Sequence, residues 1–540
     1  MGSCLPWGSL SLILLVLLQP MLHSSSACFV EERAALLDIR SSLVRAHSLS
    51  ALDSWGEDGD DCCSWERVKC NNTTQRVSHL NFSYVCVTNS EGSWYANSTV
   101  FSALHDLQYL DLSYNYRCSL ALEGLVGLAK LRYLDLSFTW FGGGFPEFIG
   151  QIVSLAVLAL TGNGMTGGLP NAAVENLRNL QQLNISGNSL DGSLPASLFA
   201  LPHLKILDLS SNDFDGHISI GSFSGPISLE VLDLGFNRLN GTLPVRAFKH
   251  IRSLNLGHNQ FSGSLPVSLF ALPQLNSLDL SYNYFEGHFP TSVSSEPVQL
   301  EVLHLESNML SGALPTERET RNLQNLRELV DAIFQSVSES KLYFGGYDLS
   351  GFTFATKGNI YTYGRDFFDS MAGIDLSANM LHGEIPWDLG NLSHVKSLNL
   401  SYNFFVGPIP PTLGSMEEIE SLDLSHNELS GLIPWQLNQL SSLGAFSVAY
   451  NNLSGCIPNY GQLGSFSMDS YLANTNLHDI TQGNTCAAPG PDPAVGNDVE
   501  ETPNDLVLYV VTTAGFVLTF WATVGFSFCH PYGRSVMLKL

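Results

Sequence analysis

In this 540-residue chain many of the residues that could do chemistry, such as aspartates and aromatic residues, recur at regular spacing because they belong to a repeated sequence segment. The aspartates that recur in copies of Leu-Asp-Leu-Ser, such as Asp208 and Asp279, are part of the repeat consensus and not the paired acids of a catalytic site. The histidines are scattered, and the sequence has no phosphate-binding loop, HExxH zinc motif, nucleophile elbow or paired CxxC motifs. We therefore predict that the chain is not an enzyme, with no catalytic residues, no metal site and no cofactor.

Aromatic rings and histidines recur just before a repeated asparagine, and these rings are candidates for binding. The set is Tyr114, Phe138, Phe236, His258, Tyr282, Tyr402, His426 and Tyr450. Rigid amphipathic rings in a row form a plausible binding stripe, whereas the alternative is that they stack between repeats and serve the fold. In the copy that ends at Asn308, His304 and Glu306 replace the usual Asp and Ser. We expect specificity at that copy, with His258 and Tyr282 as the neighbouring rings.

These residues belong to a template, LxxLxLxxN, with copies such as LQYLDLSYN (107–115) and VKSLNLSYN (395–403). Its asparagines are Asn115, Asn163, Asn188, Asn212, Asn237, Asn259, Asn283 and Asn308, then Asn379, Asn403, Asn427 and Asn451. The spacing within each block is 22 to 25 residues, apart from one doubled gap in which Thr139 replaces Asn. Such a period predicts a stack of supersecondary units.

The template predicts an α/β leucine-rich-repeat solenoid, a curved superhelix with a parallel β-sheet on its concave face. The leucines of one unit cannot be buried without the next unit, so stacking completes the core. Each buried Asn side chain can satisfy backbone groups where the chain leaves the strand. Outward strand positions then form columns across the repeats, and a ligand would be recognised there.

Most copies continue with xLxGxIP or xLxGxLP, as in GEIP (383–386) and GLIP (431–434). These residues resemble the plant-type extracellular leucine-rich repeat, and CCSWERVKC (62–70) looks like the N-terminal cap of that family. The template disappears between Pro315 and Met371, and this insert resembles the island domain of plant leucine-rich-repeat receptor-like proteins, kinase-lacking cell-surface receptors. Lys357 and Tyr363, in KGNIYTY (357–363), match a Lys-x5-Tyr pattern of such islands and are further candidates for ligand binding.

Ten cysteines are present, of which eight lie between the two hydrophobic ends of the chain. An even number of extracellular cysteines predicts disulfides. The resemblance to the cap family implies that Cys28 pairs with Cys62 and Cys63 with Cys70. Proximity suggests two further pairs, which are Cys86 with Cys118 and Cys456 with Cys486, although the sequence does not determine connectivity.

Nine N-x-Ser/Thr sequons fit a secreted glycoprotein. They begin at Asn71, Asn72, Asn81, Asn97, Asn184, Asn240, Asn391, Asn399 and Asn452. Asn184 and Asn399 lie inside the strand template, where a glycan would obstruct the concave sheet. The alternative is that Leu-Asn-Leu-Ser arises simply as a variant of Leu-Asp-Leu-Ser.

The two ends predict the topology. An apolar run at 9–18 is too short to span a bilayer and is followed by Ser25 and Ala27, which predicts a signal peptide cleaved before Cys28. Residues 506–528 contain no charge, and 23 residues reach roughly 35 Å as a helix, enough for one transmembrane helix. Acidic residues precede this segment and Arg534 and Lys539 follow it, which predicts a single-pass type I plasma-membrane protein with its N-terminus outside.

The predicted organisation follows from these features. It comprises a signal peptide (1–27), a cysteine cap (28–76), a first repeat block (77–315), the island (316–370), a second block (371–455), a C-terminal cap (456–486), an acidic stalk (487–505), the transmembrane helix (506–528) and a cytosolic tail (529–540).

Function is predicted to be binding outside the cell. The 24 basic and 50 acidic residues give a net charge of −26, which argues against nucleic acid as a partner. The resemblance implies a receptor for an extracellular peptide or a microbe- or damage-derived elicitor, signalling through an adaptor or co-receptor kinase in the same membrane, in plant defence. The alternatives are a developmental peptide-signalling co-receptor and a wall or hydrolase-binding protein like the polygalacturonase inhibitors.

Overall fold

The computed structural model describes residues 28–46, 52, 55–56, 61–85, 95–96, 98–116, 119–120, 122–219, 228–289, 300, 302–314, 352–356, 359–363, 373–458 and 460–478. The chain divides into a unit of residues 1–484, which contains all of these ranges, and a second unit of residues 485–540.

The N-terminal segment closes the end of the repeat stack. Helix α2 (Val30–Ala46) carries Glu32, whose buried carboxylate accepts a hydrogen bond from the Val77 backbone at 3.0 Å and lies 3.3 Å from the Arg76 guanidinium. Burial raises the pKa of Glu32, against the opposing effect of the Val77 and Arg76 hydrogen bonds. These contacts fix the helix over the first strand, so the leucines of the first repeat are covered.

Two disulfides hold this segment together, and both were predicted. Cys28 is bonded to Cys62 and Cys63 to Cys70. Cys456 is also disulfide-bonded, while its predicted partner Cys486 and the predicted pair Cys86 and Cys118 lie outside the described residues.

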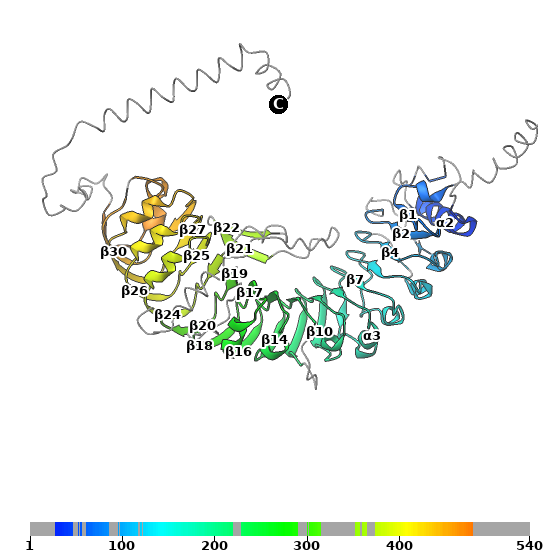
Figure 1. Ribbon diagram of the computed structural model, residues 1–540, viewed down its shortest axis with the longest axis horizontal. Helices are drawn as coiled ribbons and strands as arrows, with labels where there is room; N and C mark the ends of the chain where they lie inside the picture. Colours follow the sequence, from blue (N-terminus) through cyan, green and yellow to red (C-terminus); the bar gives the residue numbers. More distant parts are fainter. Residues whose placement is uncertain are drawn as a thin grey trace, which may run out of the picture. The chain divides into compact units, whose positions relative to one another are not determined.

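The repeats form two sheets on opposite sides of the stack. The inner sheet has 15 strands and is parallel except where β1 meets β2. Its strands are β1 (Val68–Cys70), β2 (Val77–Asn81), β4 (Tyr109–Asp111), β6 (Tyr133–Asp135), β7 (Val157–Ala159), β9 (Gln182–Asn184), β11 (Ile206–Asp208), β13 (Val231–Asp233), β15 (Ser253–Asn255), β17 (Ser277–Asp279), β19 (Val302–His304), β23 (Gly373–Asp375), β25 (Ser397–Asn399), β27 (Ser421–Asp423) and β29 (Ala445–Ser447). Figure 1 shows β17, β19, β25 and β27 toward the inside of the arc of repeats.

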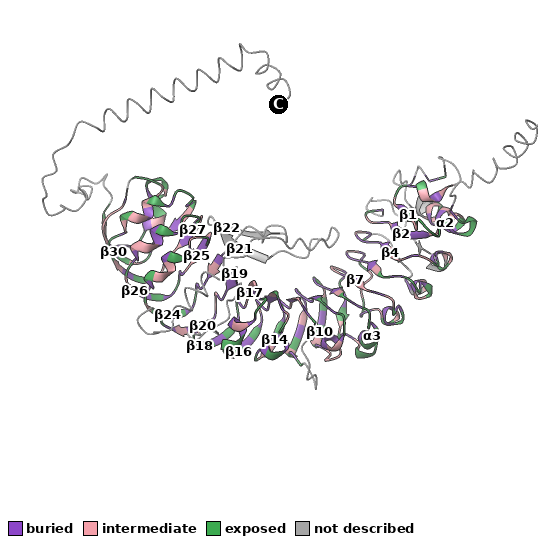
Figure 2. Ribbon diagram, viewed as in Figure 1, coloured by how far each residue is buried: buried purple, intermediate pink, exposed green. Residues whose placement is uncertain are grey.

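The outer sheet has 12 strands and lies on the other side of the repeats (Figure 1). Its strands are β8 (Thr166–Gly167), β10 (Ser189–Ser193), β12 (Asp213–His217), β14 (Arg238–Gly241), β16 (Gln260–Ser264), β18 (Tyr284–His288), β20 (Met309–Gly312), β24 (Met380–Glu384), β26 (Phe404–Pro408), β28 (Glu428–Gly431), β30 (Asn452–Cys456) and β31 (Asn476–His478). In strands such as β16, β24 and β26 one buried residue lies between exposed ones, and Figure 2 shows exposed residues in green along the outer strands. The glycine of the LxGxIP motif adopts a positive φ here, 90° at Gly383 and 82° at Gly431, which accounts for the glycine at this point of the motif.

Short helices connect the sheets. They are η2 (Cys62–Ser64), η3 (Ser98–Ala103), η4 (Glu123–Gly127), η5 (Glu147–Gln151), α3 (Asn171–Asn176), η6 (Leu198–Ala200), η7 (Val245–Ala247), η8 (Val267–Ala271), η10 (Trp387–Asn391), η11 (Pro411–Ser415), η12 (Trp435–Gln439), η13 (Leu463–Ser465) and η14 (Met468–Tyr471). Two small sheets complete the described elements, one of β3 (Tyr95–Ala96) with β5 (Ser119–Leu120) and one of β21 (Phe352–Thr356) with β22 (Asn359–Tyr363).

The repeated asparagine ties each repeat to its neighbour, as predicted. In Asn283, Oδ1 accepts a hydrogen bond from the Phe261 backbone at 2.9 Å, and Nδ2 donates to the carbonyls of Leu256 and Leu280 at 2.9 and 3.1 Å. Phe261 and Leu256 belong to the preceding repeat, so one buried amide satisfies backbone groups of two repeats. We call the set of these asparagines the Asn ladder.

The Asn ladder continues across the insert between the two blocks. Strand β19 pairs directly with β23, and Asn379 accepts a hydrogen bond from Leu310 at 3.1 Å and donates to the Leu305 carbonyl at 2.9 Å. The insert therefore leaves and re-enters the solenoid without interrupting either sheet. The helical pattern at 322–337 lies outside the described residues.

The predicted transmembrane helix at 506–528 also lies outside the described residues. Among the helices that the structure describes, none is both long and apolar enough to cross a bilayer.

Replacing Asn283 by Ala should destabilise the stack, because it leaves the Phe261 N–H and the Leu256 and Leu280 carbonyls without this partner. Each buried group left unpaired costs about 1–3 kcal/mol. We expect urea unfolding, followed by circular dichroism, to occur at a clearly lower urea concentration for N283A.

Thr139 supplies the matched control. Its hydroxyl already donates to the Leu136 carbonyl at 2.7 Å, so T139N restores the template without removing a backbone partner. T139N should unfold at the wild-type urea concentration or above it. Equal midpoints for N283A and the wild type would show that the Asn ladder is dispensable.

Candidate functional site

The outward positions of the inner sheet are dominated by one column of carboxyl and amide side chains, which we call the acid column. In register from β2 to β29 it reads Asn81, Asp111, Asp135, Ala159, Asn184, Asp208, Asp233, Asn255, Asp279, His304, Asp375, Asn399, Asp423 and Ser447. Within this column no more than two carboxylates adjoin one another.

A local hydrogen-bond motif explains why Asp is frequent in this column. The Asp279 carboxylate accepts hydrogen bonds from the backbone and hydroxyl of Ser281 at 2.9 and 2.7 Å, and the same Asp-x-Ser geometry recurs at Asp111 and Asp208. It satisfies the backbone where the strand ends. The aspartates of the repeats therefore serve the fold.

Burial and mutual repulsion disturb the adjacent carboxylates. Burial, with the Asp111 charge beside it, raises the pKa of Asp135 to about 6. Burial, with the Asp208 charge beside it, raises the pKa of Asp233 well above its usual range. An Asn at the next position reduces this repulsion, because the Asn255 amide donates a hydrogen bond to the Asp233 carboxylate at 3.2 Å. The electrostatics of the column therefore limit how many acids it can hold in a row.

His304 is the one imidazole in the acid column, and it lies between Asp279 and Asp375 in the register. Its Nδ1 lies 3.5 Å from the Glu306 carboxylate, and its side chain is only 5% exposed. Burial lowers the pKa of His304, but the charges of Glu306, Asp279 and Asp375 outweigh burial and raise it to about 9. A positive imidazolium therefore lies between Asp279 and Asp375, at a position where a carboxylate would be repelled by both.

Glu306 is the partner of this imidazolium. Burial raises the pKa of Glu306 to about 7, despite the attraction of His304, and its Oε2 is buried with no hydrogen-bond partner among the described residues. The predicted candidates His304 and Glu306 therefore form one ion pair within the sheet. His304 is too buried to contact a ligand directly, so its influence on a ligand is electrostatic.

The predicted rings stack across successive repeats in three runs. The runs are Tyr84, Tyr114 and Phe138; Phe236, His258 and Tyr282; and Tyr402, His426 and Tyr450, with ring centroids 3.9 to 4.7 Å apart. Small residues separate them, namely Gly162, Gly187 and Ser211 between the first two runs and Ser307 and Ala378 between the last two. The rings therefore do not form one continuous stripe. The sequence prediction did not include Tyr84, because its repeat lacks the terminal Asn.

Each of these rings occupies a left-handed backbone position, with φ of 53° at His258 and 49° at Tyr282. Such a conformation is unusual for a bulky residue, and stacking on the neighbouring ring offsets its cost. The faces of the rings are covered while their edges remain open, and Tyr282 is 49% exposed. The stacking alternative and the binding alternative are therefore compatible.

The structure brings four of the six predicted binding residues together. His258 stacks on Tyr282 at 4.1 Å, and the Tyr282 backbone donates to the Glu306 carbonyl at 2.9 Å, next to His304. Tyr363 ends β22, opposite Phe352 of β21. Lys357 lies outside the described residues.

Comparison with known families identifies the class of protein. A leucine-rich-repeat N-terminal domain matches residues 31–71, and leucine-rich repeats match 96–140, 153–214 and 228–285, with shorter matches at 130–152, 394–416 and 418–440. The matched segments of the chain are leucine-rich repeats, preceded by a leucine-rich-repeat N-terminal domain.

Its similarity to curated proteins is to plant receptor-like proteins, as predicted. It is 31% identical over 177 residues to Receptor-like protein 15 of Arabidopsis thaliana and 32% identical over 183 residues to Receptor like protein 21 of the same plant. These matches cover 31% and 32% of this chain and 18% of each relative. The solved structure of the plant peptide hormone receptor RGFR1 in complex with RGF2 superposes with a TM-score of 0.52 at 25% identity, covering 71% of this chain and 57% of that chain.

Replacing His304 by Asp should destabilise the inner sheet strongly. It would place three adjoining carboxylates in the acid column and leave Glu306 without a cation, and breaking a buried ion pair costs about 3–5 kcal/mol. The double variant H304N/E306S should lose no more than about 1 kcal/mol. It recreates the Asn-x-Ser arrangement of Asn399, which donates to Asp375 at 2.9 Å.

The His304 pair also predicts a pH dependence. The pKa of His304 is raised from an unfolded value of roughly 6.5 to about 9, so its stabilisation is complete below pH 6.5 and is lost as the pH rises through 9. Glu306, with its pKa raised to about 7, shifts stability in the same direction at lower pH. Between pH 7 and 9.5 the melting temperature of the wild type should fall more than that of H304N/E306S. Parallel melting curves for the two proteins would contradict the assignment.

Glycan occupancy should follow the burial of each sequon. Asn184 is 7% exposed, and the Asn399 amide donates to Asp375, so we expect both to be unmodified. Asn391 and Asn452 are exposed and should carry glycans. Enzymatic deglycosylation in heavy-oxygen water followed by mass spectrometry reports each site. A glycan on Asn399 would be incompatible with the observed packing of β25.

Proposed function

We propose that this chain is a cell-surface receptor-like protein that binds an extracellular peptide, or a microbe- or damage-derived molecule, on the inner sheet around Tyr282 and His304. The observation that carries the proposal is the departure of His304 and Glu306 from the Asp-x-Ser motif beside an exposed ring. The similarity to receptor-like proteins and to the ectodomain of a peptide hormone receptor supports this class of function.

The geometry suggests how this surface recognises a ligand. The run of rings ends at Tyr282, and the following positions carry the small side chains of Ser307 and Ala378. The small side chains leave space beside the Tyr282 ring. A ligand side chain can pack against the ring there, and the Tyr282 hydroxyl can form a hydrogen bond. The His304 imidazolium offsets the negative charge of Asp279 and Asp375, so acceptor groups of a ligand meet less repulsion.

The insert contributes to the same proposal. It leaves the solenoid after β20 of the outer sheet and re-enters at β23 of the inner sheet, which pairs with β19, so its C-terminal end adjoins the strands that carry His304 and Asp375. Lys357 and Tyr363 belong to this insert, and we include them among the proposed ligand-binding residues. Their side chains would complement the acid column, which supplies carboxylates and amides.

Signalling through a receptor kinase in the same membrane completes the proposal. By resemblance to receptor-like proteins that lack a kinase, we assign phosphorylation to a partner. We assign the contacts with that partner to the second repeat block, the acidic stalk and the predicted membrane helix, and the output to plant defence.

Tyr282 and Tyr84 allow a matched test in plant cells. Each ring ends a run and stacks on one neighbouring ring, at 4.1 and 4.3 Å, and they are 49% and 54% exposed. Proximity labelling from the full-length chain, in resting tissue and in tissue treated with extracellular fluid from infected plants, should find a receptor kinase enriched after treatment. Y282A should abolish this enrichment at unchanged protein abundance, whereas Y84A should preserve it.

The outcomes separate the possible functions. Enrichment that persists in Y282A but is lost in Y84A would move the ligand site to the N-terminal end of the first block. No receptor kinase in either tissue, together with potent inhibition of wall-degrading hydrolases by the purified chain, would replace the receptor with an inhibitor. Enrichment in growing tissue, without elicitation, would indicate development instead of defence.

A further inference from the structure

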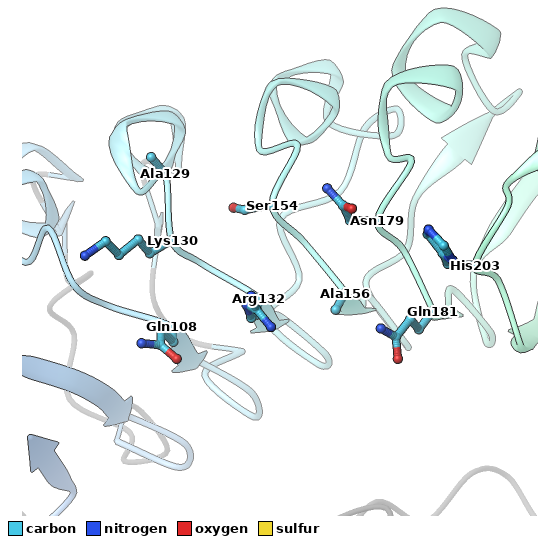
Figure 3. Close-up of a pocket in the computed structure, with 9 residues that line it drawn as sticks. All are labelled: Gln108, Ala129, Lys130, Arg132, Ser154, Ala156, Asn179, Gln181 and His203. Atoms are coloured by element: carbon cyan, nitrogen blue, oxygen red, sulfur yellow. The ribbon is translucent and has the colours of Figure 1, made fainter. Parts of the chain in front are cut away.

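A hollow of about 460 Å³ lies along one edge of the inner sheet in the first block, well before the His304 repeat. Five successive repeats line it, and Figure 3 shows their side chains. The lining residues are Gln108, Ala129, Lys130, Arg132, Ser154, Ala156, Asn179, Gln181 and His203. None of these nine is Asp or Glu, although the chain as a whole carries a net charge of −26.

The hollow exists because one repeat has small outward side chains. The position that opens each strand segment carries Gln108, Arg132, Ala156 and Gln181 in four consecutive repeats, so Ala156 leaves a notch between two long side chains (Figure 3). The same repeat has Ala159 in the acid column, in register between Asp135 and Asn184. The column of stacked rings formed by His79, Tyr109 and Tyr133 likewise ends at Val157 of this repeat.

The two cations of the hollow, Lys130 and Arg132, differ in whether a described carboxylate neutralises them. Farther along the same row, Lys205 and Arg252 both pair with Glu230, at 2.8 and 3.9 Å. Lys130 pairs with Asp106 at 2.7 Å, but Arg132 pairs with no carboxylate in the part of the chain that the structure describes. A guanidinium at the wall of a notch is suited to bind a carboxylate through two parallel hydrogen bonds.

The remaining lining residues are suited to hydroxyl groups. Ser154 donates to the Leu131 carbonyl at 2.7 Å and Asn179 donates through Nδ2 to the Val153 carbonyl at 2.8 Å, which leaves the Asn179 Oδ1 as an acceptor. The Gln108 and Gln181 amides make no side-chain hydrogen bond to the described residues and supply both donors and acceptors. The apolar lining is limited to two alanines, so the hollow offers no pocket for a large apolar side chain of a peptide.

We propose that this hollow binds an acidic oligosaccharide, with a sugar carboxylate on Arg132 and sugar hydroxyls on Gln108, Asn179 and Gln181. A ligand with a carboxylate and several hydroxyls on each unit matches a wall that combines one unpaired guanidinium with several amides. The row of repeats supplies this wall over several successive strands, which suits a chain of sugar units. The site is separate from the surface around Tyr282 and stands independently of the function proposed there.

The test uses the purified full-length chain in detergent and a hexamer of 1,4-linked galacturonic acid as the probe, measured by isothermal titration calorimetry. A galactose hexamer provides the neutral comparison, and a hexaglutamate peptide provides the acidic peptide comparison. The galacturonic acid hexamer should bind at least about tenfold more tightly than either. Its affinity should fall as salt rises, because an exposed ion pair is screened.

Two variants connect this binding to the hollow. R132Q removes the guanidinium, and A156Q fills the notch without changing the charge, so each should weaken the galacturonic acid hexamer by at least about tenfold. R246Q, on η7, removes the same charge outside the hollow and should change the affinity less than twofold. Unchanged melting curves for the three variants confirm folding, which is expected because Arg132 and Arg246 are exposed.

Three results would overturn the proposal. One is that the galacturonic acid hexamer fails to bind, or binds no better than the galactose hexamer. Another is that R246Q weakens binding as much as R132Q, which would indicate non-specific charge attraction. The third is that hexaglutamate binds as tightly and is equally sensitive to R132Q and A156Q, which would assign the hollow to an acidic peptide. None of these results bears on the Y282A test.

Discussion

The hydrogen bonds of the Asn ladder are the interaction on which the rest of this structure depends. A three-residue strand in one repeat cannot bury its leucines or satisfy its backbone alone, and each Asn amide supplies partners to two repeats at once. The same geometry is kept where the chain departs for the insert and returns, as Asn379 and Leu310 show. Because the inward positions and the Asn satisfy the fold, the outward positions are free to vary.

That freedom is limited by electrostatics. Aspartate is favoured in the acid column because it accepts hydrogen bonds from the serine two residues later, yet adjoining buried carboxylates repel one another. The column therefore alternates short acidic stretches with asparagines, and His304 occupies a place where a third carboxylate would otherwise adjoin two others. A departure from the template at such a place changes the charge of the sheet and its stability together.

The sequence predicted the parts of the structure that the repeat determines. The period, the inward leucines and the role of the Asn were confirmed, because each depends on local spacing. The two disulfides of the N-terminal segment, which the resemblance to the cap family implied, were also confirmed. It also identified His304 and Glu306 as departures, but not that the two form a buried ion pair. That contact depends on how the column stacks, which the pattern alone does not give.

The hollow around Ala156 could not be predicted for a related reason. An alanine in a strand template looks unremarkable until the repeats are aligned in register, and only then does it fall between Arg132 and Gln181. The same alignment was needed to see that the rings form three separate runs and that the Asn399 amide is already engaged by Asp375. A recognition site of this kind is made by what one repeat lacks relative to its neighbours.

The distribution of cations along the inner sheet then suggests a division of the surface. Through most of the acid column an anionic ligand would approach buried carboxylates and be repelled. Two cations on the described inner sheet bear on this, Arg132, which borders the Ala156 notch, and His304, which separates Asp279 from Asp375. The first presents its charge to solvent and can bind an anion directly, whereas the second is buried and only reduces repulsion at its surface. The two sites should therefore select ligands of different chemistry. Each ligand would then be bound independently of the other.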